Sequence, residues 1–217
     1  IIAGVRTAYF NARAQLSLLE ACRLHNPGIR IVFASTRQIY GKPDYLPVDE
    51  KHPLRPVDVN GINKLAGESY HLLYHRVHGI RSTVLRLTNT IGPRMRIKDA
   101  RQTFVGVWIR NLLEGRAIEV WGGEQLRDFT YVDDAVEAFL LAASRPEALG
   151  EIFNVGGTAP VNLKELAELL VSVNGAAQQS LQVPASFATA PVNAQAVAAM
   201  FSASGISAGF DNTAGTV

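Results

Sequence analysis

The sequence contains a single cysteine, Cys22, among 217 residues, which excludes an internal disulfide framework and any multi-cysteine metal site. It has no run of about 18 apolar residues, the length that a membrane-spanning helix needs, and its start lacks the basic-then-apolar order of a signal peptide. An excess of one charge sign is also lacking, because 21 Lys and Arg face 19 Asp and Glu and the basic residues are scattered. We therefore expect a cytoplasmic protein that binds neither a membrane nor nucleic acid.

Charged side chains almost disappear toward the C-terminus. Every basic residue lies at or before Lys164, and the stretch from 169 to 217 has Asp211 as its one charged residue. This stretch is rich in Ala, Ser, Val and Gln and has no helical or strand period, whereas the surface of a folded domain needs charge. Residues 171–217 are therefore predicted to be a low-charge tail, either a flexible linker or a stretch read out of frame.

Before this tail, amphipathic helices alternate with short apolar strands. The helices are expected at 9–25, 58–78, 104–113, 132–143 and 162–170, and the strands at 31–34, 82–87, 117–121, 129–132 and 152–155. Residues 41–56 are rich in proline, aspartate and glycine, which is typical of a surface loop. Strands separated by helices of this length predict an α/β fold with a partial doubly wound parallel (Rossmann-like) sheet.

Polar side chains follow two of the expected strands at the point where each strand ends. The strand at 31–34 is followed by Ser35 and Thr36, Lys64 is on the next helix, and Asn89 follows the next strand. In an open parallel sheet, ligands bind outside the carboxyl ends of the strands. These side chains are therefore expected to converge on one crevice.

Six segments carry more specific patterns, such as Arg-Asp-Phe-Thr-Tyr-Val-Asp-Asp at 127–134. The six lie at 11–23, 33–41, 64–68, 85–94, 127–134 and 153–157. Together and in this order they resemble the extended short-chain dehydrogenase/reductase family, specifically its NAD-dependent sugar-nucleotide epimerases and dehydratases, over about residues 11–170. The resemblance implies hydride transfer between a sugar carbon and a bound nicotinamide, with a nucleotide-sugar substrate and NAD as cofactor, NADP not being excluded.

The resemblance also implies a domain organisation. Residues 1–95 would be the C-terminal part of a dinucleotide-binding domain. Residues 96–170 would be a small interleaved substrate-binding subdomain with segments that return to the sheet.

Catalytic and cofactor roles follow from the resemblance by position. Thr36 takes the place of the family's catalytic Ser/Thr, which donates a hydrogen bond to the sugar oxygen. Lys64 takes the place of the catalytic lysine, whose charge binds the nicotinamide ribose and lowers the pKa of a neighbouring phenol. Asn11 and Ser35 are assigned to the cofactor side of the cleft.

Two further residues are assigned to the substrate. Asn89 would contact the sugar nucleotide, and Arg127 would hold its diphosphate, because a forked guanidinium suits a dianionic group. The alternative for Arg127 is an ion pair with Asp128 or Asp133.

One position departs from the family pattern. The general base of the family is a tyrosine four residues before the lysine, and here that position is Asn60. An amide does not ionise near neutral pH, so the usual proton relay is missing. Tyr40 or a bound water could substitute, and Asn60 could equally be the N-cap of its helix. Arg37 and Gln38 replace the Asp-Glu of the 4,6-dehydratases, which favours an epimerase or a simple oxidoreductase over a dehydratase.

The chain also contains no Gly-x-x-Gly-x-x-Gly phosphate loop. In the family this loop follows the first strand and places the cofactor pyrophosphate at a helix N-terminus. We therefore expect a fragment without the adenosine-binding half, which retains NAD poorly.

The leading hypothesis is an NAD-dependent epimerase of nucleotide-activated sugars, impaired in this chain. Two alternatives stay open: a catalytically silent homologue that binds a sugar nucleotide or a partner, and a sugar-nucleotide 4,6-dehydratase.

The first two helices carry apolar stripes that permit a homodimer as well as ordinary packing. His71 and His75 have the spacing of a zinc pair but lack the glutamate of a metalloprotease, so surface histidines and no metal are expected.

Overall fold

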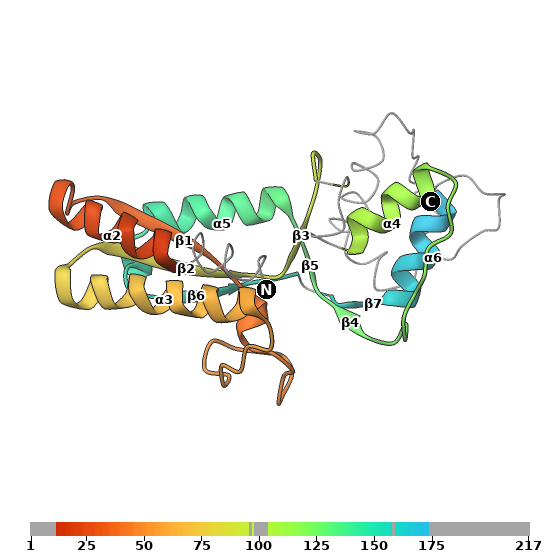
Figure 1. Cartoon of the computed structure of the whole chain (residues 1–217), viewed down its shortest axis with the longest axis horizontal. Helices are drawn as coiled ribbons and strands as arrows, with labels where there is room; N and C mark the ends of the chain where they lie inside the picture. The colour runs from red at the N-terminus through yellow and green to blue at the C-terminus, as the bar shows by residue number, and fades with distance from the viewer. Residues whose placement is uncertain (1–11, 96, 98–103, 158, 174–217) are drawn as a thin grey trace. The chain divides into compact units, whose positions relative to one another are not determined.

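The structure is a computed structural model that describes residues 12–95, 97, 104–157 and 159–173 (Figure 1). The helices are α2 (Ala14–His25), α3 (Val59–His78), α4 (Phe104–Leu113), α5 (Val132–Ser144) and α6 (Leu163–Val173), with 3₁₀ turns η2 (Arg37–Ile39) and η3 (Pro146–Ala148). The strands are β1 (Arg30–Thr36), β2 (Arg81–Leu87), β3 (Asn89–Ile91), β4 (Leu126–Arg127), β5 (Phe129–Tyr131), β6 (Ile152–Val155) and β7 (Val161–Asn162). None of the described helices is long and apolar enough to span a membrane.

The described residues form two compact units. The first contains the residues up to 88 together with 134–155, and the second contains 89–133 together with the residues from 156 onward. The domain boundaries expected at 95 and 170 stay predictions. Of the expected tail 171–217, only the end of α6 is among the described residues.

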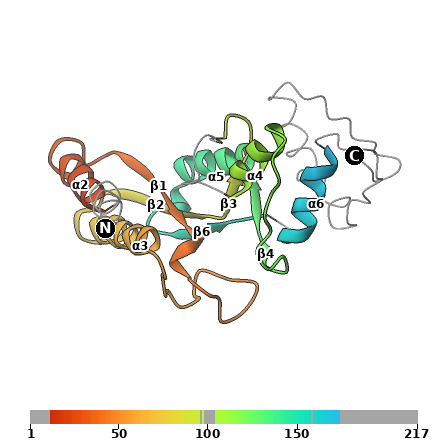
Figure 2. The ribbon, with the colours of Figure 1, turned by 45° about the vertical axis from the view of Figure 1, so that its right-hand side comes forward.

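The first unit is built on a parallel sheet of strand order β1–β2–β6. Its strands are in register at their carboxyl ends, where Thr36 pairs with Leu87 and Leu87 with Val155. Helix α3 packs against β1 and β2, and α2 lies beside α3 in both views (Figures 1 and 2). Figure 1 shows α5 on the other side of the strands from α3. This arrangement confirms the predicted α/β fold with a parallel, Rossmann-like sheet.

Helix α3 has well-defined ends. Asp58 is its N-cap, because its Oδ1 accepts a hydrogen bond from the Gly61 N–H at 2.7 Å. At the other end Gly79 adopts the left-handed conformation with φ 70°, and its N–H donates to the His75 carbonyl. The alternative that Asn60 is the N-cap of this helix is therefore wrong, since Asp58 is in that position and Asn60 lies inside the first turn.

A buried histidine joins α2, α3 and the sheet. His71 is 0% exposed and stacks on the Phe33 ring with centroids 4.7 Å apart. Its Nδ1 lies 3.3 Å from Ser82 Oγ and its Nε2 lies 3.2 Å from Gln15 Oε1. Burial lowers the pKa of His71 to about 4. The expectation of a surface histidine is wrong here, because position 71 is on the side of α3 that faces β1 and β2. No group of residues suited to a metal ion occurs in the described part of the chain.

Glycine allows α3 to approach the sheet closely. A Cβ on Gly67 would lie 2.6 Å from Phe33 Cζ, and one on Gly61 would lie 2.8 Å from the Gln38 carbonyl oxygen. Both distances are shorter than a carbon atom tolerates. The first half of α3 is thereby held against β1 and the turn that follows it.

The loop 41–56 closes on itself. Gly41 has φ 68°, and a Cβ at this position would clash with the Arg55 carbonyl oxygen, so the two ends of the loop are in contact. Inside it, the Asp44 N–H donates to His52 Nε2 at 2.8 Å, and Asp44 also forms an ion pair with Arg55 at 3.0 Å. His52 is 2% exposed. The predicted loop is confirmed, and its own side chains order it.

In its described residues, the second unit has two small sheets and one apolar core. β3 pairs with β5 in parallel, and β4 pairs with β7 in antiparallel fashion. The core is formed by α4, α6 and neighbouring residues, among them Trp108, Phe129 and Leu170. Asn162 caps α6 by accepting from the Glu165 N–H at 2.8 Å, as predicted. The strand expected at 117–121 is wrong, since these residues have no regular structure.

Candidate functional site

Thr36 ends β1 at the carboxyl edge of the sheet of the first unit. Its Oγ1 accepts the N–H of Gln38 at 3.3 Å, and this bond caps η2. Gln38 Oε1 in turn accepts from Asn60 Nδ2 on the first turn of α3 at 2.5 Å. Thr36, Gln38 and Asn60 are thus joined by one chain of hydrogen bonds. Among the described residues the Thr36 hydroxyl proton has no acceptor, so it can donate to a ligand.

Lys64 lies one helical turn after Asn60. Its Nζ donates to the Ala34 carbonyl at 2.8 Å and lies 5.1 Å from the centroid of the Phe33 ring. The ammonium is half-buried, and desolvation lowers its pKa below the usual value of a lysine. An ammonium has three N–H donors, and within the part of the chain that the structure describes Ala34 uses one of them, which leaves two for a bound molecule.

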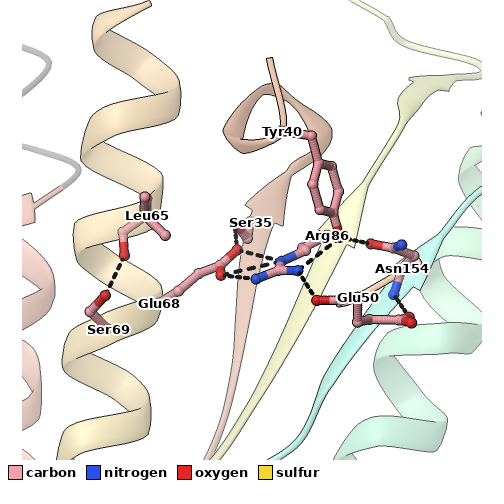
Figure 3. A network of polar contacts seen from close by, with 8 residues as sticks. All are labelled: Ser35, Tyr40, Glu50, Leu65, Glu68, Ser69, Arg86 and Asn154. Atoms are coloured by element: carbon pink, nitrogen blue, oxygen red, sulfur yellow. Dashed lines mark hydrogen bonds and ion pairs between the residues drawn. The ribbon is translucent and has the colours of Figure 1, made fainter. Parts of the chain in front are cut away.

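Ser35, expected on the cofactor side, is directed away from the surface. It is 4% exposed, and its hydroxyl donates to Glu68 Oε1 (Figure 3). Glu68 also pairs with Arg86 of β2. A contact between the Ser35 side chain and a cofactor stays a prediction, and it would require the hydroxyl to leave Glu68.

Tyr40 is not suited to replace the absent general base. It is 5% exposed, and its hydroxyl accepts from Arg86 Nη1 at 2.8 Å and donates to Asn154 Oδ1 at 2.6 Å (Figure 3). Burial raises the pKa of Tyr40, which opposes formation of the phenolate that a base needs.

The two residues expected to contact substrate lie in the second unit. Asn89 Nδ2 donates to the Asp128 carbonyl at 2.8 Å, which joins the start of β3 to the residue before β5. Arg127 Nη1 donates to the neighbouring Leu126 carbonyl at 2.8 Å. Among the described residues Arg127 forms no ion pair with Asp128 or Asp133, so the alternative structural explanation for Arg127 is not supported.

The structure therefore brings the predicted site residues together in two groups. Ser35, Thr36, Asn60 and Lys64 form the group in the first unit. Asn89 of β3 and Arg127 of β4 are in the second unit, where Asn89 is bonded to the carbonyl of Asp128, the residue that follows Arg127. Asn11 lies outside the described residues, and its role stays a prediction.

A sequence profile of the NAD dependent epimerase/dehydratase family matches residues 2–156, more than half of the chain. The chain belongs to this family. It is 35% identical over 162 residues to a Methanocaldococcus jannaschii protein assigned as a UDP-glucose 4-epimerase, covering 74% of this chain and 52% of that protein. This family member thus spans about half the length of the curated relatives it matches.

Solved structures agree with this membership. The UDP-glucose 4-epimerase of Thermotoga maritima, solved with UDP-glucose, has a TM-score of 0.74 and 31% identity over 81% of this chain and 57% of its own. A double mutant of a dTDP-glucose 4,6-dehydratase from Streptomyces venezuelae, solved with NAD, has a TM-score of 0.71 and 26% identity over 78% of this chain and 51% of its own. Both similarities support the Rossmann-like architecture.

Proposed function

We propose that this family member carries part of the active site of an NAD-dependent epimerase of nucleotide-activated sugars. The observation that supports the proposal is that Thr36 ends β1 at the carboxyl edge of the sheet, where ligands of open α/β folds bind, and that Lys64 Nζ is bonded to the Ala34 carbonyl of the same strand. Thr36 donates its free hydroxyl proton to an oxygen of the sugar. Lys64 offers two N–H donors and a positive charge to the hydroxyls of the cofactor ribose.

The residues around Lys64 fit one end of a nicotinamide cofactor. The half-buried ammonium is held in place by the Ala34 carbonyl and has hydrogen-bond donors to spare. When bound, NAD would supply the acceptor for a hydride from a sugar carbon and return it to the opposite face. Asn89 and Arg127 would bind the nucleotide part of the substrate.

Proton transfer is the weak step of this site. As the hydride leaves a sugar carbon, the hydroxyl on that carbon must lose its proton. Asn60 and Gln38 are neutral amides bonded to each other at 2.5 Å, and neither can accept a proton near neutral pH. Water must then take the proton, so we expect turnover that is slow compared with a site that holds an ionisable base.

Because Asn60 and Gln38 provide no proton acceptor, the second candidate function is a catalytically silent homologue that binds a sugar nucleotide or a partner. A 4,6-dehydratase is a less favoured candidate. Elimination of water needs an acid and a base beside Thr36, and Arg37 and Gln38 supply neither of the carboxyl groups that this requires.

The experiment is an epimerase assay on the chain and on the Asn60→Tyr variant. With NAD and UDP-glucose supplied, we expect slow formation of the C4 epimer by the wild type. The variant should be faster by about 10²- to 10⁴-fold, the usual contribution of a positioned acid–base group. Chromatographic separation of the nucleotide sugars measures both. Asn26→Tyr, a change at an exposed position after α2, is the matched control and should leave the rate unchanged.

Each result of this assay distinguishes the candidates. Activity that appears only in Asn60→Tyr would establish the silent homologue, and a 4-keto-6-deoxy product would establish the dehydratase. If neither protein changes any nucleotide sugar, the epimerase proposal fails.

We propose in addition that the protein forms a homodimer through α2 and α3. Apolar side chains are exposed along one stripe of α3, where Ile62 is 54%, Leu73 47% and Val77 62% exposed. On α2, Leu18 and Leu24 are also exposed. Two such helix pairs can bury these stripes against each other as a four-helix bundle.

Light scattering coupled to size-exclusion chromatography tests the dimer. We expect twice the mass of one chain for the wild type and a monomer for Leu73→Glu, because a charge in an apolar interface is left without a partner. Val57→Glu, at an exposed apolar residue outside the helices, is the control and should stay dimeric. A wild type with the mass of one chain refutes the proposal.

A cytoplasmic location is also part of this proposal. Its support is the single cysteine: Cys22 is buried and free, so the described part of the fold does not depend on an oxidising compartment.

A further inference from the structure

A buried ion pair lies next to the candidate site of the first unit (Figure 3). The side chains of Glu68 on α3 and Arg86 on β2 are each 2% exposed, and Arg86 Nη2 lies 2.8 Å from Glu68 Oε2. Arg86 Nε also donates to both carboxylate oxygens at 3.1 and 3.2 Å. Burying two charges has a high desolvation cost, and apolar side chains of similar volume are often as stable. Stability alone therefore does not explain this pair.

The pair is connected to two residues beside Thr36. Ser35 donates to Glu68 Oε1, and Arg86 Nη1 donates to the Tyr40 hydroxyl at 2.8 Å. Ser35 immediately precedes Thr36, and Tyr40 immediately follows the 3₁₀ turn η2. The two hydrogen bonds thus hold both ends of the segment 36–39, which contains Thr36 and Gln38.

The same pair reaches the loop and the third strand. Tyr40 donates to Asn154 Oδ1 on β6 at 2.6 Å, and Asn154 Nδ2 donates to the Val48 carbonyl at 3.0 Å. Arg86 Nη1 donates to the Glu50 carbonyl at 3.3 Å, and Glu50 Oε1 accepts the Asn154 N–H at 2.6 Å. The network therefore joins α3, all three strands and the loop 41–56 (Figure 3).

We propose that Glu68 and Arg86 are positioning residues for the candidate site. Glu68 is one helical turn after Lys64, so the pair fixes the helix that carries Lys64 and Asn60 relative to the turn that carries Thr36 and Gln38. Neither charge needs to touch a ligand. The inference rests on the proposed function for its kinetic consequence only, because the geometry of η2 can be measured without ligand.

The test is the double variant Glu68→Met with Arg86→Met, which replaces the pair by two apolar side chains. We expect a melting temperature close to that of the wild type, because no buried charge is left unpaired. We also expect hydrogen exchange at the Gln38 and Tyr40 amides, followed by NMR, to become at least about tenfold faster as η2 loses its anchors. In the epimerase assay kcat should fall at least about tenfold with a smaller change in KM.

A second pair of variants keeps the test decisive if the double methionine protein does not fold. Ser35→Ala with Tyr40→Phe leaves the ion pair but removes both links to η2, and it should also speed exchange at Gln38 and Tyr40. Ser82→Ala with Tyr74→Phe removes two other buried hydroxyls of the same unit and should not.

Unchanged exchange at η2 in the double methionine protein, or in the serine–tyrosine variant, overturns the proposal and makes the pair a packing element only. If the wild type shows no epimerase activity, the proposed function fails. The exchange rates then still decide the positioning role.

Discussion

Replacing Arg86 alone by methionine is expected to lower the free energy of unfolding by about 3–5 kcal/mol. The substitution leaves the Glu68 carboxylate 2% exposed and without its cation. Tyr40 also loses the donor on its hydroxyl. Since domains are stable by about 5–15 kcal/mol, the variant should unfold at much lower urea concentration, which circular dichroism measures.

Arg76→Met is the matched control for this loss. Arg76 is exposed on α3, and its one hydrogen bond to a described residue goes to the Leu72 carbonyl of its own helix. Its replacement should change the free energy of unfolding by less than about 0.5 kcal/mol. Equal losses for Arg76→Met and Arg86→Met would show that the Glu68 charge is solvated in the folded protein, contrary to the structure.

Acid should destabilise the first unit through His71. The pKa of this residue is lowered from 6.5 to about 4 in the folded protein. Between these pH values the imidazole is protonated in the unfolded chain and neutral in the folded protein. Stability from the neutral imidazole is complete above pH 6.5 and decreases as the pH falls from 6.5 to 4. Over this window the loss reaches about 3 kcal/mol. Urea titrations at several pH values measure it.

Two variants isolate the contribution of this residue. His71→Gln cannot titrate and should remove most of the dependence of stability on pH between 6.5 and 4. His25→Gln, at the exposed end of α2, should retain it. If both variants keep the slope of the wild type, the acid sensitivity originates elsewhere, and His71 is hydrated enough to be protonated in the folded state.

Local signals in the sequence were sufficient for the elements of the first unit. Helix α3 was predicted at 58–78 and observed at Val59–His78, because Asp58 and Gly79 are strong start and stop signals. The strand at 82–87 was predicted from its apolar run and observed one residue longer. The second unit was harder, because its strands are two or three residues long and depend on partners distant in the chain.

The depth of a side chain was the main quantity that the sequence did not reveal. Helical spacing shows that His71 shares a face with other residues, but it does not show which face meets the sheet. The location of Thr36 and Lys64 near the carboxyl edge of the sheet was predicted from the order of strands and helices in the sequence, because the topology of a parallel sheet determines which residues follow the strand ends.

The Glu68–Arg86 pair was missed, although one signal was present. Arg86 is a charge within an otherwise buried strand, and a buried guanidinium requires a carboxylate partner. The sequence offered several carboxylates on nearby elements. The choice of Glu68 depends on the packing of α3 against β2, which only the structure shows.

The closed form of the loop 41–56 bears on how the protein can change during evolution. Gly41 and Arg55, at the two ends of the loop, are in contact. Insertions near the tip of the loop therefore make it longer without moving its ends, so β1 and α3 keep their positions. Asp44 and residues 48–50 are exceptions, because Asp44 is bonded to His52 and Arg55, and Val48 and Glu50 are bonded to Asn154. Homologues should therefore differ most in length between positions 44 and 48 and little after position 48. Such a loop can acquire new surface chemistry while the strands behind it are inherited unchanged.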